Sequence, residues 1–143
     1  MKPSHSRPQR RGFTLVEVLL VLVILVIIVS LVTTNVISAQ RRAYKKAAEA
    51  AVGMLDSPLQ MYYLDMTEFP TSEQGLEALR NPPAGLANPE KWDGPYLAKA
   101  VPVDPWGNPY EYVCPGKYNT DSYDLWSYGP DKVSGTDDDI GNW

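Results

Sequence analysis

Apolar residues follow one another almost without interruption near the start of the chain. The sequence from Phe13 to Val32 is FTLVEVLLVLVILVIIVSLV, in which Glu17 is the only charged residue. As a helix rising 1.5 Å per residue, this stretch would be about 30 Å long, which matches the hydrocarbon core of a bilayer. A buried core helix is the alternative, but it needs burial on every side, and the roughly 110 residues beyond it could hardly supply it. We therefore predict a transmembrane helix over residues 13–35.

A narrow apolar stripe at helical spacing continues beyond this segment. Its members are Tyr44, Ala47, Ala48, Ala51, Val52 and Leu55. The simplest prediction is one continuous helix from Phe13 to about Asp56, whose second half is amphipathic. Proline removes a backbone donor and disfavours helix at the residue before it. We therefore expect Pro58 to kink or break the helix, which can resume over residues 58–66.

The rest of the chain predicts a short helix and a small sheet. Thr71 and Gln74 have the spacing of a capping box, which predicts a helix of about nine residues that ends before a proline pair. Residues 84–95 are rich in Gly, Pro and Asn and are interpreted as a loop. From Tyr96 onward, aromatic and β-branched residues between turn clusters predict two or three short antiparallel strands. Packed on the amphipathic half of the helix, these strands would complete an α+β head spanning residues 36–143.

Charged residues indicate the orientation of the apolar segment. Residues 1–12 carry four positive charges and no acid, so the positive-inside rule leaves the N-terminus in the cytoplasm and exports the remainder of the chain. The net charge of −4 for the whole chain leaves −8 from Phe13 onward. One basic cluster in this acidic part is interpreted as a solvated band or a band that faces lipid headgroups, and it consists of Arg41, Arg42, Lys45 and Lys46. We expect no nucleic-acid partner.

Two further features bear on how the chain is processed and stabilised. The basic start fits a cleaved secretory signal, but the apolar run is longer than the about 7–15 residues of such a signal, and SLVTTNVISAQ offers only a weak cleavage site. A small residue, Gly12, instead precedes the run. Cys114 is the only cysteine, so no intrachain disulfide can form even in an oxidising compartment.

The C-terminal stretch SYGPDKVSGTDDDIGNW gathers aspartates and glycines. Asp131, Asp137, Asp138 and Asp139 lie within nine residues, interleaved with glycines. A flexible loop of this composition suits a hard cation such as Ca²⁺, which takes about six to eight oxygen ligands from carboxylates, hydroxyls and carbonyls. A solvated acidic turn is the alternative. The spacing is not that of an EF-hand.

Signals of catalysis are nearly absent from the sequence. The only histidine, His5, lies in the basic leader, and the single cysteine has no histidine partner in the exported part. The motifs G-x-S-x-G, H-E-x-x-H and the P-loop do not occur. The sequence therefore predicts that the protein is not an enzyme, and it disfavours a signal-anchored enzyme or binding module.

The stretch GFTLVEVLLVLVIL resembles the class III signal of type IV pilin-like proteins, with a basic leader, a glycine, and then Phe-Thr-Leu-x-Glu in front of an apolar run. Beyond it, YYLDMTEFPTSEQGLEAL, VPVDPWGNPYEY and YDLWSYGPD with DDIGNW are similar to the major pseudopilins of the type II secretion system. The resemblance covers essentially the whole chain. It implies a type IV pilin-like fold, in which a long N-terminal helix packs on a small antiparallel sheet.

The resemblance also implies a route of processing and assembly. A prepilin peptidase would remove the leader, residues 1–12, by cutting between Gly12 and Phe13, and would N-methylate Phe13. The mature chain would sit in the inner membrane by a single pass and then join a homopolymer, with residues 13–35 in the filament core and the heads outside. The periplasmic filament, together with minor pseudopilins and an inner-membrane assembly platform, would drive folded proteins through a secretin channel.

A type IV pilin for adhesion, motility or DNA uptake is the alternative reading of the same N-terminal signal. Such pilins commonly close a disulfide loop near the C-terminus, which one cysteine cannot make. The resemblance further implies calcium as a cofactor in the tail. Its ligands would be the side chains of Asp131, Thr136 and Asp138 with the backbone carbonyls of Tyr128 and Val133, although Lys132 stands where related loops commonly have glycine.

Glu17 is the residue that an ordinary membrane helix does not explain. A lone carboxylate at bilayer depth costs roughly 3 kcal/mol on insertion scales, although a carboxylate in a first helical turn is favoured by the helix dipole. After cleavage at Gly12, the amine of Phe13 in a neighbouring copy would be a natural partner for this charge. We therefore predict that Glu17 sets the register of assembly. The alternative is an interfacial glutamate that reaches water.

Overall fold

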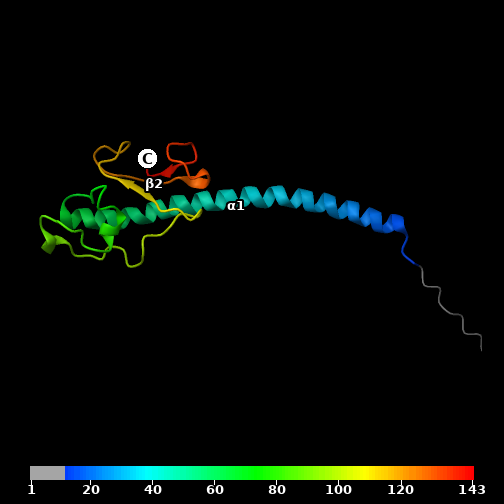
Figure 1. The fold of residues 1–143 in the computed structure, drawn as a ribbon, viewed down its shortest axis with the longest axis horizontal. Helices are drawn as coiled ribbons and strands as arrows, with labels where there is room; N and C mark the ends of the chain where they lie inside the picture. Colours follow the sequence, from blue (N-terminus) through cyan, green and yellow to red (C-terminus); the bar gives the residue numbers. More distant parts are fainter. Residues whose placement is uncertain (1–11) are drawn as a thin grey trace, which may run out of the picture. The chain divides into compact units, whose positions relative to one another are not determined.

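The computed structural model describes residues 12–143, apart from the side chains of residues 31–35, and Figure 1 traces the chain. Residues 1–11, which include most of the predicted leader, lie outside the described residues. The regular elements are α1 (Leu15–Met66), β1 (Glu111–Val113), β2 (Asp124–Ser127) and β3 (Ile140–Gly141), with 3₁₀ turns η1 (Leu76–Leu79), η2 (Pro89–Lys91) and η3 (Gly129–Asp131). The chain divides into two compact units, Met1–Gln40 and Arg41–Trp143, and each is described by itself.

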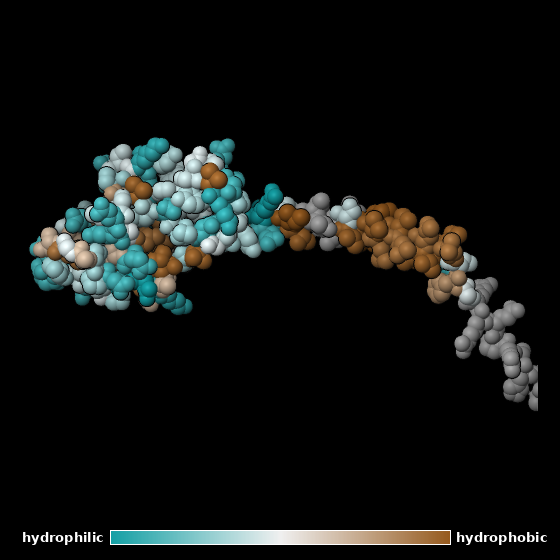
Figure 2. Space-filling model, viewed as in Figure 1, coloured by the Kyte–Doolittle hydropathy of each residue, from teal (hydrophilic) through white to brown (hydrophobic). Residues whose placement is uncertain are grey.

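The first unit contains the start of α1 and its apolar side chains. Every described apolar side chain between Phe13 and Ile37 is exposed, from 85% for Phe13 to 46% for Ile24. On the face that Figure 2 shows, most of these side chains form a hydrophobic surface over the first part of the helix. The sequence predicts a transmembrane helix over residues 13–35. Within the part of the chain that the structure describes, none of the helices combines the length and hydropathy that a membrane crossing requires.

Helix α1 passes through Pro58 without ending. A kink or a break was expected at Pro58; the helix runs as one element to Met66, so the expected break was wrong. Pro58 lies on the buried face of the helix, beside Leu59 and Leu55. The burial of this face offsets the backbone hydrogen bond that proline cannot donate, because packing an amphipathic face contributes more to helix stability than local propensity does.

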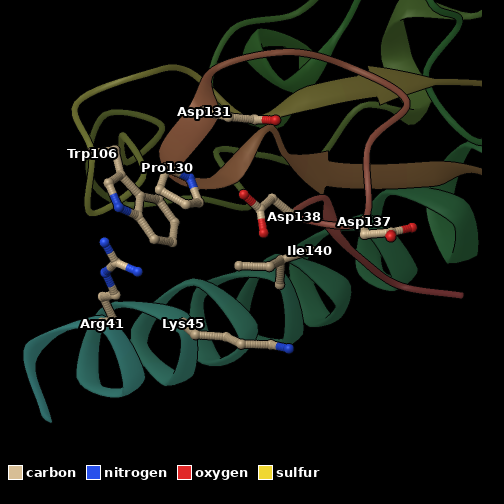
Figure 3. Close-up of a pocket in the computed structure, with 8 residues that line it drawn as sticks. All are labelled: Arg41, Lys45, Trp106, Pro130, Asp131, Asp137, Asp138 and Ile140. Carbon is tan, nitrogen blue, oxygen red and sulfur yellow. The ribbon is translucent and has the colours of Figure 1, made fainter. Parts of the chain in front are cut away.

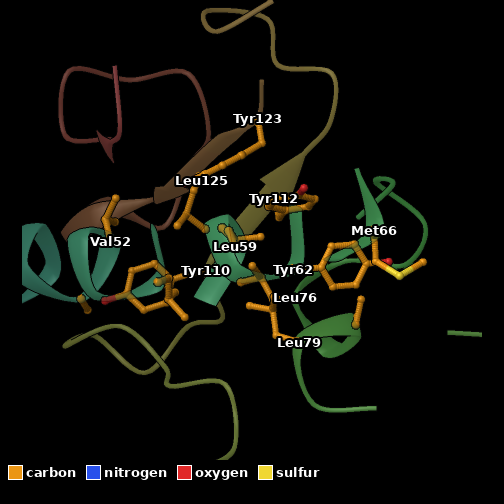
Figure 4. Close-up of a cluster of buried hydrophobic side chains, with 13 residues drawn as sticks. Val52, Leu59, Tyr62, Met66, Leu76, Leu79, Tyr110, Tyr112, Tyr123 and Leu125 are labelled. Carbon is orange, nitrogen blue, oxygen red and sulfur yellow. The ribbon is translucent and has the colours of Figure 1, made fainter. Parts of the chain in front are cut away.

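The core of the second unit, Arg41–Trp143, forms where one face of α1 meets the sheet. The buried residues of the helix keep the 3.6-residue period and begin at Ala48, whereas Tyr44 and Ala47 of the predicted stripe are exposed. Figure 4 shows the side chains that meet this face from η1, β1 and β2, and the cluster includes Leu76, Leu79, Tyr110, Tyr112, Tyr123 and Leu125. All of these residues belong to the second unit, so a fragment of residues 36–143, here called the head fragment, contains its whole core.

Tyrosines make up an unusual share of this core. The hydroxyl of Tyr112 donates to the carbonyl of Pro70 at 2.8 Å, and that of Tyr123 donates to a carboxylate oxygen of Asp56. Burial raises the pKa of Tyr110 to about 12, and the nearby Asp104 carboxylate adds to the rise. Burial likewise raises the pKa of Tyr112 and Tyr123 above the ordinary value. These phenols therefore stay neutral and pack as large apolar bodies with one polar end.

The three strands form an antiparallel meander in the order β1-β2-β3. Tyr112 pairs with Leu125 between β1 and β2, and Ser127 pairs with Ile140 between β2 and β3. The α+β class and the antiparallel sheet packed on α1 are as the sequence predicts. The third strand lies in the acidic tail, in a stretch that the sequence analysis considered only as a loop.

The predicted short helix after Thr71 is smaller than expected. The capping-box contacts are present, since the backbone N–H of Thr71 donates to the side-chain oxygen of Gln74 at 3.0 Å and the N–H of Gln74 donates to the hydroxyl of Thr71 at 3.3 Å. Gly75 comes next with a φ of 58°, which a helix does not allow, so only the four-residue 3₁₀ turn η1 forms beyond it. The capping box therefore closes a turn instead of starting an α-helix.

The loop between β1 and β2 is organised around the carboxylate of Asp124, which is 2% exposed. Its oxygens accept hydrogen bonds from the backbone N–H groups of Lys117, Tyr118 and Asn119, at 2.6, 2.8 and 2.9 Å. Burial alone would raise the pKa of this carboxyl group, but the hydrogen bonds from Tyr118, Asn119 and Lys117 outweigh it and lower the pKa below the ordinary value. The ionised form of Asp124 therefore stabilises the folded head.

We predict that Asp124→Ala destabilises the head fragment by about 2–4 kcal/mol, because three backbone N–H groups lose hydrogen bonds to a charged acceptor. Asp121→Ala, an exposed residue of the same loop, is the matched control and should have little effect. The stabilisation by the Asp124 charge is complete above the unfolded pKa of 3.8 and is lost as the pH falls through the lower folded value. Thermal unfolding at pH 7 and at successive pH values below 4 measures both effects. A constant gap between wild type and variant down to the lowest pH would contradict the assignment.

Candidate functional site

The first candidate site is the start of α1, where processing and assembly residues were predicted. Gly12 and Phe13 precede the helix and are exposed, so the bond between them is accessible. The helix begins at Leu15, two residues later than predicted, because Thr14 serves as its N-cap. The described part of this site therefore consists of an open peptide bond followed at once by a helix start.

Glu17 lies in the first turn of α1 and completes a capping box with Thr14. The backbone N–H of Glu17 donates to the Thr14 hydroxyl at 3.2 Å, and the backbone N–H of Thr14 donates to a carboxylate oxygen of Glu17 at 3.4 Å. The N–H of Glu17 also donates to the carbonyl of Thr14 at 3.1 Å, so the capping box gives this donor a second acceptor and gives the N–H of Thr14 an acceptor. This role was not predicted from the sequence, although Thr14-x-x-Glu17 has the same spacing as the Thr71 and Gln74 pair. Glu17 thus has a local structural function besides any role in assembly.

The second candidate site is the tail loop, residues 128–139, which connects β2 to β3. Gly129 starts it with a φ of 71°, and a Cβ atom at this position would lie 2.3 Å from the carbonyl oxygen of Asp138. The N–H of Gly129 donates to the hydroxyl of Ser127 at 3.1 Å, and this hydroxyl donates to the buried carboxylate of Asp104 at 2.6 Å. The close approach at Gly129 therefore brings the two ends of the loop together.

Hydrogen bonds within the loop link four of the five residues predicted as calcium ligands. A carboxylate oxygen of Asp131 accepts the N–H of Val133 at 3.0 Å, and the hydroxyl of Thr136 donates to the carbonyl of Val133 at 3.4 Å. The N–H of Asp138 in turn donates to the hydroxyl of Thr136 at 3.4 Å. Tyr128, the remaining predicted ligand, immediately precedes Gly129 at the closure of the loop. The two bonds to Thr136 are long and therefore weak, so an ion could replace them.

Lys132 has the backbone conformation that a glycine would favour, with a φ of 60° in the left-handed region. The loop therefore keeps its turn despite this side chain, at a local cost in strain.

Asp139 is a further tail residue with the chemistry of a cation ligand. One of its carboxylate oxygens accepts the N–H of Gly135 at 2.7 Å, whereas the other is buried and has no hydrogen-bond partner. An unpaired buried carboxylate oxygen is costly unless a cation or a donor satisfies it. Among the described residues, no three His, Cys, Asp or Glu side chains gather closely enough to hold a metal ion by themselves. Any cation here would depend on backbone carbonyls and the Thr136 hydroxyl as well, as the prediction supposed.

Asp131 and Asp138 also line a cavity of about 430 Å³ in the second unit, together with Asp137 and side chains of α1. Figure 3 shows Asp138 between Pro130 and Ile140, whereas the carboxylate of Asp137 points away from the cavity. The loop therefore presents one acidic wall of this cavity.

Comparison with known families gives two matches that together cover nearly the whole chain. The family described as "Type II secretion system (T2SS), protein G" matches residues 35–143. The "Prokaryotic N-terminal methylation motif" matches residues 7–33. The second match includes Gly12, Phe13 and Glu17, and the first includes every predicted ligand in the tail.

Comparison with individual proteins leads to the same family. The type II secretion system core protein G of Aeromonas hydrophila is 45% identical over 136 residues, which are 94% of this chain and 93% of the relative. The core protein G of Pseudomonas aeruginosa is 43% identical over 138 residues, which are 96% and 97% of the two chains. The crystal structure of the major pseudopilin from the type 2 secretion system of enterohaemorrhagic Escherichia coli is similar, with a TM-score of 0.66 and 40% identity over 76% of this chain and 94% of that chain.

We predict that Gly129→Ala opens the tail loop and destabilises the head fragment more than Gly135→Ala does. Both glycines have a positive φ, at 71° and 86°, so both substitutions add backbone strain of about 1–2 kcal/mol. Only Gly129 lies against another backbone atom, whereas a Cβ at Gly135 meets nothing within 4 Å. Thermal unfolding of the two variants should therefore show about twice the loss for Gly129→Ala. Equal losses would mean that the contact with Asp138 does not hold the loop.

Proposed function

The chain belongs to the type II secretion system protein G family, and we propose from this that it is the major pseudopilin of such a system. Copies of the chain polymerise into a periplasmic pseudopilus that drives the export of folded proteins across the outer membrane. The family is structural, which agrees with the expectation that the protein is not an enzyme. A type IV pilin for adhesion or motility is not favoured, because the relatives that match along nearly the full length are secretion-system proteins.

The observation that carries this proposal is the exposed apolar surface of the first unit. Side chains from Phe13 to Ile37 leave a far larger hydrophobic surface uncovered than a monomer in water tolerates. Such a surface needs either lipid or other copies of the same helix around it. A membrane-anchored subunit that later enters a filament core meets both requirements in turn.

In the proposed assembly pathway, the leader first lies in the cytoplasm and residues 13–35 are anchored in the inner membrane. A prepilin peptidase then cuts after Gly12 and methylates the new amine of Phe13, which the methylation motif supports. An inner-membrane assembly platform adds the mature chain to the filament, which also contains minor pseudopilins and works against a secretin channel. Because each copy adds to the next in the same way, the contact is heterologous and the polymer stays open.

We further propose that the tail loop holds a calcium ion. Asp131, Thr136 and Asp138 would supply side-chain oxygens, and Tyr128 and Val133 would supply carbonyls. Two features of the loop support this fit: the closure at Gly129 and the weak contacts of Thr136. The ion would neutralise carboxylates that otherwise repel one another, and it would fasten β3 to the sheet without a disulfide.

We predict that Glu17 acts in assembly through its charge as well as through the capping box. Glu17→Gln keeps a side-chain oxygen for the N–H of Thr14 but removes the charge, whereas Glu17→Ala removes both. If the carboxylate pairs with the Phe13 amine of a neighbouring copy, both variants should be cleaved at Gly12 yet fail to form filaments or support secretion. Intact mass of the membrane-extracted chain measures cleavage and methylation, and electron microscopy with a secretion assay measures assembly.

The two Glu17 variants also separate the competing explanations. Normal filaments from Glu17→Gln with failure of Glu17→Ala would assign the residue to helix capping alone. Normal filaments from both variants would show that Glu17 is only an interfacial residue. Gly12→Val, which should leave the uncleaved precursor, controls for failures that arise before assembly.

The calcium proposal predicts that the head fragment unfolds at a temperature several degrees higher with calcium than with EGTA, since a ligand that binds only the folded state stabilises it. Magnesium should do much less, because it tolerates such an irregular ligand set poorly. Asp131→Asn and Asp138→Asn should abolish the difference, while Asp121→Asn, an exposed aspartate outside the tail, should leave it unchanged. Identical melting of the wild-type fragment in both buffers would establish the solvated acidic turn instead.

A further inference from the structure

The start of the second unit carries a basic band made of Arg41, Arg42, Lys45 and Lys46. All four side chains are exposed, and none of them forms an ion pair with another described residue. Arg41 and Lys45 are four residues apart on α1 and therefore share one face of the helix, and Arg42 and Lys46 share the adjacent face. Like charges at this spacing repel one another, so an external anion would stabilise the band.

Two of these cations line the cavity of about 430 Å³ that Figure 3 shows, where Arg41 and Lys45 lie along α1 and Trp106 lies above Arg41. The tail loop forms the opposite wall. In this view the carboxylates of Asp131 and Asp137 point away from Arg41, whereas Asp138 lies in the cavity between the loop and α1, and no ion pair joins it to Arg41 or Lys45 among the described residues. The side of the cavity formed by α1 and Trp106 therefore combines two positive charges with an indole ring.

Trp106 is held in this position by the turn that carries it. The buried carboxylate of Asp104 accepts the N–H of Trp106 at 3.0 Å and the N–H of Asn108 at 2.7 Å. The indole ring packs edge-on against Tyr44, with 5.9 Å between the ring centroids. Aromatic rings with one polar edge, placed beside lysine and arginine, are the side chains enriched at the headgroup level of membranes.

The position of the band along the chain favours a membrane as the source of the anion. Arg41 comes four residues after Ile37, the last exposed large apolar residue of the first unit, which is about 6 Å of helix. The headgroup layer on each side of a bilayer is about 5–8 Å thick. If the apolar segment is anchored as proposed, the cations lie at the depth of the lipid phosphates.

We infer that Arg41 and Lys45, with Trp106 beside them, dock the head on the anionic phospholipid surface of the membrane that anchors the chain. This inference rests on the proposed function, because it describes the subunit before it enters the filament. Sixteen acidic and nine basic residues from Arg41 onward give the head a net charge of −7. Net charge alone predicts repulsion from an anionic surface, whereas a local band predicts binding, so the two expectations have opposite signs.

The test is co-sedimentation of the head fragment with vesicles, in EGTA so that calcium cannot bridge protein and lipid. The vesicles consist of phosphatidylcholine alone or of phosphatidylcholine with phosphatidylglycerol at three to one. The wild-type fragment should bind only the anionic vesicles, and less at high salt. Arg41→Glu with Lys45→Glu should weaken binding at least about tenfold, and Trp106→Phe should weaken it to a smaller extent.

The matched control is Lys91→Glu with Lys99→Glu, two exposed lysines of the same unit whose reversal changes the net charge equally. This pair should keep the greater part of the binding, and thermal unfolding should show that both double variants remain folded. Equal losses in the two pairs, or no binding by the wild type, would overturn the inference. Release of the wild type by millimolar inorganic phosphate would also overturn it, since it would indicate a site for a free anion.

A filament assay with the full chain separates this inference from the proposed function. If the basic band docks on lipid, Arg41→Glu with Lys45→Glu should slow assembly but leave filaments that form with normal appearance. If the Arg41→Glu with Lys45→Glu variant binds vesicles as the wild type does but forms no filaments, the band makes contacts between copies. This result would contradict the docking inference. Normal filaments from the full chain, together with no vesicle binding by the wild-type head fragment, would also contradict the inference. This result would leave the proposed pseudopilin function unaffected.

Discussion

The packing of one helix face against three very short strands is the interaction on which the head depends. The strands have three, four and two residues, which is too little to be stable as a sheet alone. Residues of α1 from Ala51 to Met66 provide the surface that is covered, and the strands, the residues beside them and η1 provide the tyrosines and leucines that cover it. Removing either side would leave the other without a core. The fold therefore explains why α1 continues as far as Met66.

Much of this arrangement could be predicted from the sequence because its signals are periodic. The 3.6-residue spacing of apolar residues marks α1, and the alternation around Tyr112 and Leu125 marks the sheet. The errors have local causes. Pro58 did not end the helix because burial of its face outweighs one missing hydrogen bond, and Gly75 limited η1 because its conformation lies outside the helical region. Tyr44 and Ala47 fit the stripe in sequence, but the sheet covers the helix only from Ala48.

The candidate sites were less predictable, because a carboxylate looks the same in the sequence whatever it contacts. Asp104 and Asp124 are buried and accept backbone N–H groups, so they are structural. Glu17 is partly structural, since it caps the helix with Thr14. Asp139 keeps one buried oxygen without a partner, and only the three-dimensional structure distinguishes it from its neighbours. The closure of the tail at Gly129 could not be predicted either, since it depends on a contact with a residue nine positions away.

The tyrosine core has a consequence for behaviour in alkali. A phenol that is neutral in the core resists ionisation, while the same phenol in an unfolded chain ionises near its ordinary value of 10.0. Stability from Tyr110, Tyr112 and Tyr123 is therefore complete below that pH and declines as the pH rises toward their folded values. The absorbance of tyrosinate can therefore report whether the core of the head unfolds cooperatively. Tyrosinate absorbance from the core should appear together with unfolding as one sharp step, after the exposed tyrosines have titrated gradually.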